Sequence, residues 1–162
     1  MPSNRSQPQF FVATPADAEL LLDFMRDQYA FDGHRYEREK ARAALLVLLN
    51  DGLLPHPAFG MAWLILESAT PVGYILLCFG YSLEYLGRDA FIDEFYLKES
   101  RRGRGWGRKT FEFVRAQAQL QSVRAIHLEV LRRNTAALEF YRNLGFKDHN
   151  HYVMTLRLAD PL

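Results

Sequence analysis

Three glycines at every second position mark the stretch of this chain that is best suited to hold a ligand. They are Gly103, Gly105 and Gly107, and they stand between an apolar segment and a segment with helical spacing. Glycine lets the backbone turn tightly and approach a ligand closely, and a helix start offers free N–H groups and the positive end of the helix dipole. The pattern therefore predicts a phosphate or pyrophosphate site. Basic side chains surround it: Arg102, Arg104, Arg108 and Lys109.

Two familiar phosphate loops do not fit this stretch. A Walker A loop needs glycine directly before Lys-Ser/Thr, and here an arginine separates the last glycine from Lys109. A dinucleotide loop reads G-x-G-x-x-G and opens the first βαβ unit, but this loop reads G-x-G-x-G and lies past the middle of the chain. The pattern that does fit is R-x-x-G-x-G, formed by Arg102, Gly105 and Gly107. An ordinary strand-to-helix turn is the alternative.

A second motif follows the glycine loop after a predicted strand over Ile126–Leu131. It lies on a predicted helix over Thr135–Leu144 and contains Asn134, Ala137, Tyr141, Gly145 and Phe146. The two motifs in this order resemble the GNAT superfamily of N-acetyltransferases over nearly the full length of the chain. The segment 81–96, in which a Gly-Arg turn leads into a strand with paired acids, is similar to the diamine and polyamine acetyltransferase branch.

The resemblance implies acetyl-CoA as co-substrate, with no metal. It assigns cofactor binding to the backbone of one strand, to the glycine loop and to the start of the later helix. These residues are Phe95, Tyr96, Leu97, Arg102, Gly103, Arg104, Gly105, Trp106, Gly107, Arg108, Asn134 and Ala137. Trp106 is expected to contribute packing, and Asn134 is also a candidate helix N-cap.

Two side chains are the candidates for the chemistry of acetyl transfer. The resemblance makes Glu94 the base that helps to deprotonate the amine and Tyr141 the acid that protonates the CoA thiolate. Asp93 is assigned to substrate binding, on the opposite face of the strand because side chains alternate. The alternatives are that the two carboxylates pair with Arg88 or Arg102, and that Tyr141 is a core aromatic.

The paired acids indicate a cationic acceptor, because opposite charges attract. We expect a small amine such as a polyamine or an amino-acid analogue, with Tyr29 as a further substrate-binding residue and direct transfer in a ternary complex. His34, in the same loop region, is expected to be solvated. Two alternatives stay open: a protein or peptide N-acetyltransferase, and a non-catalytic CoA-binding regulator.

Hydrophobic periodicity predicts the elements that must position these residues. The expected order is β-α-α-β-β-β-α-β-α-β, a mixed α/β fold with a mainly antiparallel sheet flanked by helices. In the GNAT fold, the strands on either side of the glycine-loop helix splay apart around the cofactor. The predicted strands are 10–13, Met61–Glu67, Val72–Leu83, Ala90–Leu97, Ile126–Leu131 and His151–Leu158, and the first two helices are Thr14–Tyr29 and Glu37–Leu49.

Length and composition predict a single domain over 1–162, with residues 1–8 flexible. A net charge of +1 gives no reason to expect nucleic acid or an anionic membrane as a partner. The single cysteine, Cys78, is expected in the core. It allows no disulfide within the chain, which suits the cytoplasm. The N-terminus lacks the apolar core of a signal peptide, and a homodimer is compatible with these features.

Overall fold

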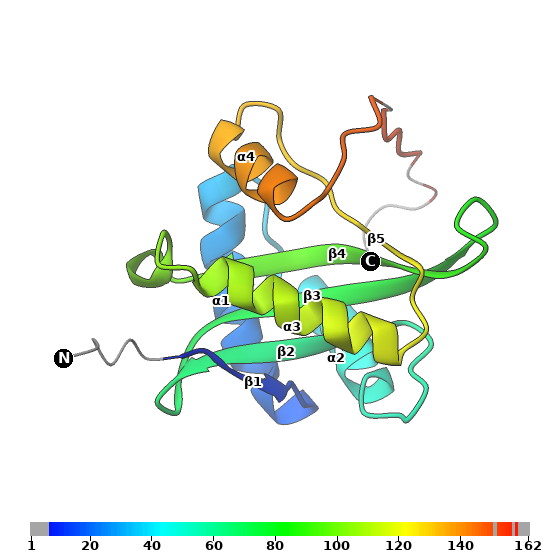
Figure 1. Cartoon of the computed structure of the whole chain (residues 1–162). Coiled ribbons are helices and arrows are strands. Elements are labelled where there is room, and N and C mark those ends of the chain that lie inside the picture. The colour runs from blue at the N-terminus through cyan, green and yellow to red at the C-terminus, as the bar shows by residue number, and fades with distance from the viewer. Residues whose placement is uncertain (1–6, 151, 157, 159–162) are drawn as a thin grey trace. The chain divides into compact units, whose positions relative to one another are not determined.

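The computed structural model describes residues 7–150, 152–156 and 158 (Figure 1). The chain divides into two compact units, residues 1–128 and 129–162, and each is treated separately below. The single domain over 1–162 stays a prediction. The N-terminal residues 1–6 lie outside the described part, whereas Gln7 accepts a hydrogen bond from the Lys109 ammonium.

The first unit is built on a five-stranded sheet in the order β1-β2-β3-β4-β5. All neighbouring strands are antiparallel except β4 and β5, which run parallel. Strands β2 and β3 form the hairpin that the sequence predicted. The strands are β1 Gln9–Val12, β2 Gly60–Glu67, β3 Thr70–Ser82, β4 Gly87–Leu97 and β5 Ala125–His127.

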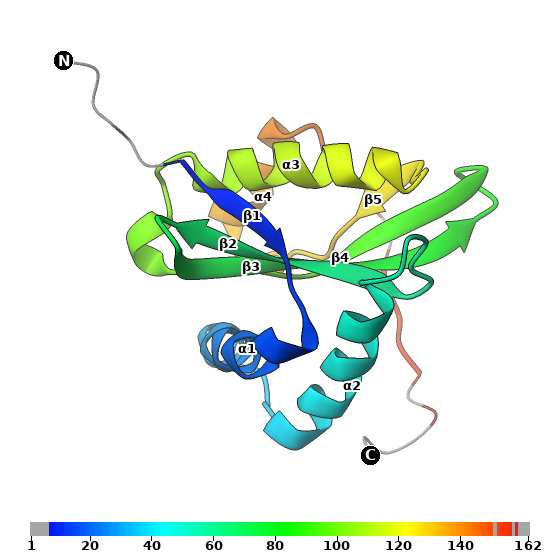
Figure 2. The same ribbon diagram turned by 90° about the horizontal axis from the view of Figure 1, so that it is seen from below.

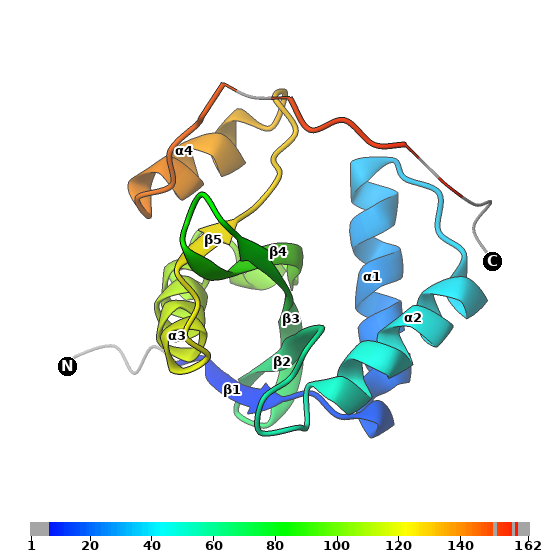
Figure 3. The ribbon, with the colours of Figure 1, turned by 90° about the vertical axis from the view of Figure 1, so that its right-hand side faces the viewer.

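Helices cover both faces of this sheet (Figures 2 and 3). Helices α1, Ala18–Asp32, and α2, Arg38–Asp51, lie on one face. Helix α3, Trp106–Leu120, lies on the other face. Two short 3₁₀ turns, Pro15–Asp17 and Glu99–Arg101, precede α1 and follow β4.

The start and end of α1 follow from local chemistry. The Asp17 carboxylate accepts hydrogen bonds from the Thr14 backbone N–H at 2.8 Å and from its hydroxyl at 2.9 Å, which fixes the turn that leads into the helix. The helix ends at Gly33, whose φ of 75° is a conformation that favours glycine. α1 therefore extends three residues beyond the predicted end at Tyr29.

Each face of the sheet has its own core. On the α1 and α2 face, Leu21, Leu22 and Tyr74 are fully inaccessible to solvent. On the α3 face, the predicted inner residues of the helix are buried: Thr110, Phe111, Val114 and Ala118. Full burial of a large apolar side chain contributes about 1.5–3 kcal/mol, so these two layers hold the sheet rigidly between the helices.

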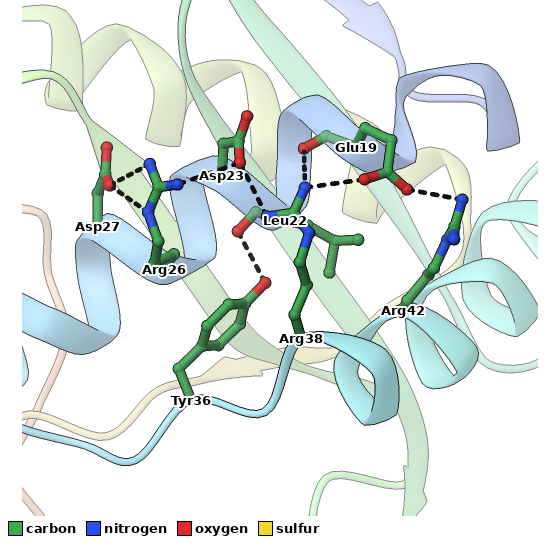
Figure 4. Close-up of polar contacts among 8 residues, drawn as sticks. All are labelled: Glu19, Leu22, Asp23, Arg26, Asp27, Tyr36, Arg38 and Arg42. Carbon is green, nitrogen blue, oxygen red and sulfur yellow. Dashed lines mark hydrogen bonds and ion pairs between the residues drawn. The ribbon is translucent and has the colours of Figure 1, made fainter.

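A network of charged side chains joins α1 to α2 on the outer surface (Figure 4). The Arg38 guanidinium donates to Glu19 and to Asp23, each at 2.8 Å, and Arg42 also pairs with Glu19 at 2.8 Å. The Tyr36 hydroxyl donates to the Leu22 carbonyl oxygen at 2.8 Å. Exposed ion pairs contribute only about 0.2–1 kcal/mol each, so the network links the two helices but adds little to their stability.

The second unit contains α4, Thr135–Asn143. The Asn134 side chain caps this helix by accepting from the Ala137 N–H at 3.1 Å, as predicted. The chain leaves the helix through Gly145, whose φ is 96°. The Tyr141 ring lies against the rings of Phe140 and Phe146, with centroid distances of 5.2 and 5.8 Å.

The predicted class and the element order up to α4 are confirmed, and two strand predictions are wrong. The strand expected over Ile126–Leu131 ends at His127, because only the first two residues of this segment, together with Ala125 before it, pair with β4. The strand expected over His151–Leu158 is not formed by residues 152–156 and 158, which are exposed and pair with no strand. Residues 151 and 157 lie outside the described part.

Candidate functional site

The paired acids of β4 lie at a β-bulge. Leu77 is opposite Ile92 and the next residue along β3, Leu76, is opposite Glu94, so Asp93 is an extra residue without a partner. A bulge of this kind breaks the alternation of side chains. Asp93 follows Ile92, so its side chain lies on the face opposite to that of Ile92. Glu94 pairs with Leu76, whose side chain also lies on that face. Both carboxylates are therefore on the face covered by α1. The expectation that the two carboxylates lie on opposite faces is therefore wrong.

Glu94 is buried, with 6% of its surface exposed. The Tyr74 hydroxyl on β3 donates to Glu94 Oε2 at 3.4 Å, and the Tyr29 hydroxyl on α1 is also hydrogen-bonded to this carboxylate. Burial, followed by the negative charge of Asp93, raises the pKa of Glu94 to about 7, while the two phenols act in the opposite direction. Close to neutral pH, this carboxylate can therefore both take up and release a proton.

The surroundings of Glu94 are acidic and aromatic. Asp32 at the end of α1 also raises the pKa of Glu94 by its charge. Cys78 on β3 is half-buried, and burial together with the charges of Asp93 and Glu94 raises the pKa of its thiol to about 11. The thiol therefore stays protonated at neutral pH and is not an activated nucleophile. His34, expected to be solvated, is exposed and lies edge-on to Tyr29.

Arg88 and Arg102, the alternative partners of the paired acids, bond elsewhere. Arg88 donates to the Pro57 carbonyl oxygen and lies over the Phe79 ring at 4.0 Å. Arg102 donates from Nε to the Leu97 carbonyl oxygen at 2.8 Å. No ion pair between these arginines and the paired acids occurs in the described part of the chain.

The glycine loop has the backbone that a phosphate site requires. Gly103 and Gly105 have φ values of 67° and 83°, which favour glycine, and a Cβ at either position would meet no atom within 4 Å. Gly105 is the N-cap of α3, so the N–H groups of the first helical turn that follow it have no acceptor within the helix. Arg104 and Arg108 are exposed beside it. The loop thus combines open space with the positive end of a helix dipole.

Packing from the sheet fixes the loop in place. Trp106 is buried against Ile65, Val72 and Leu97, so its indole acts in packing, as predicted. Arg101, just before the loop, donates from Nε to the Glu67 carboxylate at 2.7 Å. Both ends of the loop are therefore attached to the β2–β3 hairpin.

The arginine that begins the loop motif is turned toward α1. The Arg102 guanidinium lies 5.3 Å from the Phe31 ring centroid and 5.8 Å from that of Tyr96. Its aromatic neighbours and the Leu97 carbonyl oxygen hold it beside β4. In this conformation, Arg102 is exposed but turned toward the strand end, and Arg104 and Arg108 are further exposed charges beside the loop.

One edge of β4 is open where the predicted backbone contacts lie. The parallel pairing with β5 ends at Phe91 opposite His127, whereas β4 continues to Leu97. Within the described residues of the first unit, 95–97 therefore have a strand neighbour on the β3 side only. An open edge of this kind accepts an extended ligand as an added strand.

Three predicted residues belong to the second unit. Asn134 and Ala137 form the cap of α4, and Tyr141 is one turn further along the same helix. Burial raises the pKa of the Tyr141 hydroxyl to about 12. The phenol therefore keeps its proton throughout the neutral range.

Sequence reasoning missed Tyr74. It stands in the apolar run of β3 and reads as a core aromatic, and its ring is indeed fully buried. Only the register of β3 on β4 brings its hydroxyl to Glu94, which is 20 residues away in the sequence. A tyrosine in an otherwise apolar, buried strand is the one available signal, because a buried hydroxyl needs a hydrogen-bond partner.

The described part of the chain shows neither a membrane-spanning helix nor a cluster of metal-binding side chains. No described helix has the length and apolarity that crossing a membrane requires. No group of three or more His, Cys, Asp or Glu side chains within the described ranges is arranged to hold a metal ion.

The model of the acetyltransferase (GNAT) family matches residues 19–146, which is most of the chain. Among curated proteins, the thialysine N-epsilon-acetyltransferase of Bos taurus is 35% identical over 77 residues, which cover 48% of this chain and 45% of that protein. The chain thus spans about half the length of the curated relatives it matches.

Two solved structures resemble the chain over most of its length. An integron cassette protein from the mobile metagenome of Cole Harbour Salt Marsh has a TM-score of 0.80 at 29% identity, covering 94% of this chain and 92% of the other. A predicted acetyltransferase from Clostridium acetobutylicum, solved with acetyl-CoA, has a TM-score of 0.75 at 16% identity, covering 93% and 96%. The latter likeness is one of fold.

Proposed function

Because the chain belongs to the GNAT acetyltransferase family, we propose that it transfers the acetyl group of acetyl-CoA to a primary amine of a small cationic molecule. The observation that carries the proposal is the continuity of β4. One strand bears the buried Glu94, then the open backbone edge of 95–97, and leads through a short 3₁₀ turn into the glycine loop. A base, a site for an extended ligand arm and an anion site thus follow one another along a single segment.

The residues of this segment fit acetyl-CoA. The loop backbone at Gly103 and Gly105 would receive the pyrophosphate at the start of α3, with Arg104 and Arg108 alongside. The edge of 95–97 would receive the pantetheine arm by backbone hydrogen bonds. When bound, acetyl-CoA supplies the thioester carbonyl that the amine attacks and the thiolate that leaves.

Glu94 is assigned the role of base. An alkyl ammonium has a pKa near 10.4, so only roughly one amine in a thousand is neutral near physiological pH. Glu94, with a pKa of about 7, takes the proton that the amine must lose, directly or through a water. The C–N bond then forms as the C–S bond breaks, and the proton is held on Glu94 until it returns to solvent.

Tyr141 is assigned the role of acid toward the leaving sulfur. Its hydroxyl stays protonated at neutral pH, because burial raises its pKa to about 12. Full transfer of this proton to a thiolate whose conjugate acid has a pKa near 8.5 would be uphill by about 5 kcal/mol. We therefore assign Tyr141 a hydrogen bond that strengthens as negative charge develops on sulfur. As CoA departs, the sulfur takes this proton and Tyr141 regains one from solvent, so that the phenol is restored.

The acidic surroundings of Glu94 favour a cationic acceptor. The bulge directs Asp93 to the same face as Glu94, and Asp93 is exposed to solvent while Glu94 is buried. Two carboxylates at different depths suit an acceptor with a reacting amine and a second positive charge. The thialysine acetyltransferase relatives, whose name gives an amino-acid analogue as acceptor, support the same class.

A turnover screen tests the proposal. Free-thiol release from acetyl-CoA would be measured with diamines, polyamines, lysine analogues including thialysine, aminoglycosides and peptides. We expect turnover with small cationic amines and its loss in Glu94→Gln. Turnover with peptide amines alone would support the protein acetyltransferase alternative. Binding of acetyl-CoA without turnover of any amine would support the non-catalytic regulator.

A further inference from the structure

We propose that Tyr74 is a positioning residue for the acid–base chemistry of Glu94, holding the carboxylate in place and favouring its charged form. The assignment rests on the proposed function, in which Glu94 is the base. It adds a residue that neither of the two sequence motifs contains and that acts through Glu94, without a contact of its own to the reacting atoms.

The register of the sheet creates this contact. Tyr74 is opposite Tyr96, and Leu76 is opposite Glu94, so Tyr74 and Glu94 are diagonal neighbours on one face of the β3–β4 pair. At this spacing a long side chain reaches its diagonal neighbour. The Tyr74 hydroxyl and Glu94 Oε2 are 3.4 Å apart. The Phe24 ring of α1 lies almost parallel to the Tyr74 ring at 6.1 Å and restricts its motion.

The two phenols at Glu94 are not equivalent. Tyr29 comes from α1 and is partly exposed, so water can replace its hydrogen bond. Tyr74 has no exposed surface, and its hydroxyl would have no solvent partner if Glu94 moved away. A buried donor without an acceptor is costly, so the Glu94 carboxylate is held where Tyr74 can reach it.

The groups around Glu94 indicate in which direction Tyr74 shifts the pKa of Glu94. The groups that act on the ionisation of Glu94 come from three elements: Asp93 on β4, Asp32 and Tyr29 on α1, and Tyr74 on β3. The two aspartates and the burial of the site favour the neutral acid, whereas the two phenols donate to the carboxylate and favour the charged form. Without Tyr74, a larger fraction of Glu94 would be protonated at neutral pH and unable to act as a base.

Tyr74→Phe tests the proposal because it removes the hydroxyl and keeps the ring. The pKa of Glu94 would be measured in the full-length protein by carbon-detected NMR of labelled glutamate, with Glu94→Gln to assign the signal. We expect the variant to raise the pKa of Glu94 by about one pH unit. The acid limb of the kcat/KM profile with the best amine of the screen should move by the same amount, while turnover on the alkaline plateau is retained.

Tyr36→Phe is the matched control. It also removes a tyrosine hydroxyl that donates a hydrogen bond. The acceptor of that hydrogen bond is the Leu22 carbonyl oxygen of α1, not the Glu94 carboxylate. We expect this variant to lose stability without moving the pKa of Glu94. Should Tyr74→Phe not fold, 3,5-difluorotyrosine at position 74 provides the test, because a more acidic phenol donates more strongly and should lower the pKa of Glu94.

An unchanged Glu94 pKa in Tyr74→Phe, or equal shifts in Tyr74→Phe and Tyr36→Phe, would overturn the proposal. The NMR measurement separates this failure from a failure of the proposed function. If the pKa moves as expected but no amine is acetylated, Tyr74 positions Glu94 and the assignment of Glu94 as a base is wrong.

Discussion

Glu94 carries an energetic cost that follows directly from its burial. Its pKa is raised from an ordinary value of 4.5 to about 7, so the folded state binds this proton more tightly than the unfolded state. The stabilising contribution of this group to the folded state is fully present below its ordinary pKa. It is lost as the pH rises toward the pKa of the folded state. The cost in the charged form is on the order of 3 kcal/mol. The protein pays this in order to keep a base that titrates near neutrality.

Glu94→Gln should therefore change how stability depends on pH. The variant carries no ionisable group at this position, so we expect its free energy of unfolding to exceed that of the wild type at about pH 8.5 by up to about 3 kcal/mol, and to match it only at about pH 3.5, below the ordinary pKa. Urea denaturation at the two pH values measures the difference. A difference of equal size at both values would indicate a packing effect with no contribution from ionisation.

Tyr141→Phe tests the role of Tyr141 as the acid toward the leaving sulfur. The substitution keeps the aromatic contacts with Phe140 and Phe146 and removes only the hydroxyl. We expect kcat to fall by roughly 100-fold, with acetyl-CoA affinity little changed, because the hydrogen bond strengthens only as the sulfur leaves. Steady-state kinetics and calorimetry provide the two readouts. Wild-type kcat in a folded variant would leave Tyr141 as a structural aromatic.

At the scale of elements, the glycine loop depends on left-handed backbone at the start of α3. Gly105 and Gly33 form a natural pair for comparison, since their φ values are 83° and 75° and a Cβ at either would meet no atom within 4 Å. One caps the start of α3 and the other the end of α1. The same substitution at both positions therefore imposes similar backbone strain. The two positions differ in that only Gly105 lies at the proposed pyrophosphate site.

Gly105→Ala should weaken acetyl-CoA binding, whereas Gly33→Ala should not. Each variant is expected to lose about 1 kcal/mol of stability from the left-handed conformation. Only at Gly105 does the added methyl group occupy the space assigned to the pyrophosphate, so we expect Kd to rise about tenfold or more there. Calorimetric titration with CoA measures both. Equal affinities of the two variants for CoA would show that the pyrophosphate does not bind at this loop.

The elements also show where sequence patterns are informative and where they are not. The β2–β3 hairpin, the α3 inner face and the Asn134 cap were predictable because each depends on neighbours along the chain. The bulge at Asp93 and the contact between Tyr74 and Glu94 depend on how two strands align, which no local pattern records. The strand expected over 151–158 has the right alternation, but alternation alone supplies no partner strand.

For the whole molecule, the sheet predicts an order of local stability. Strand β3 is paired on both sides over much of its length, whereas β5 pairs over three residues. Amides that open only with the whole structure exchange most slowly. We therefore expect hydrogen exchange to be slowest in β3 and fast in β5.

Acetyl-CoA should add protection at a defined place. If the pantetheine arm pairs with the open edge of β4, the amides of 95–97 should exchange more slowly in its presence, together with those of the glycine loop. Mass spectrometry of exchange with and without CoA measures this. Protection confined to the loop would place the pyrophosphate there and argue against the added-strand mode.

The bulge in β4 has a consequence for how this chain tolerates changes in length. Ile92 and Glu94 face opposite sides of the sheet because their partners Leu77 and Leu76 are consecutive. Deleting Asp93 would therefore join two segments that are already in phase, and the apolar faces on both sides would stay in register. A one-residue deletion in a regularly paired part of a buried strand inverts one side of the pattern. β4 can thus gain or lose its second carboxylate by a change of length alone, without refolding the sheet around it.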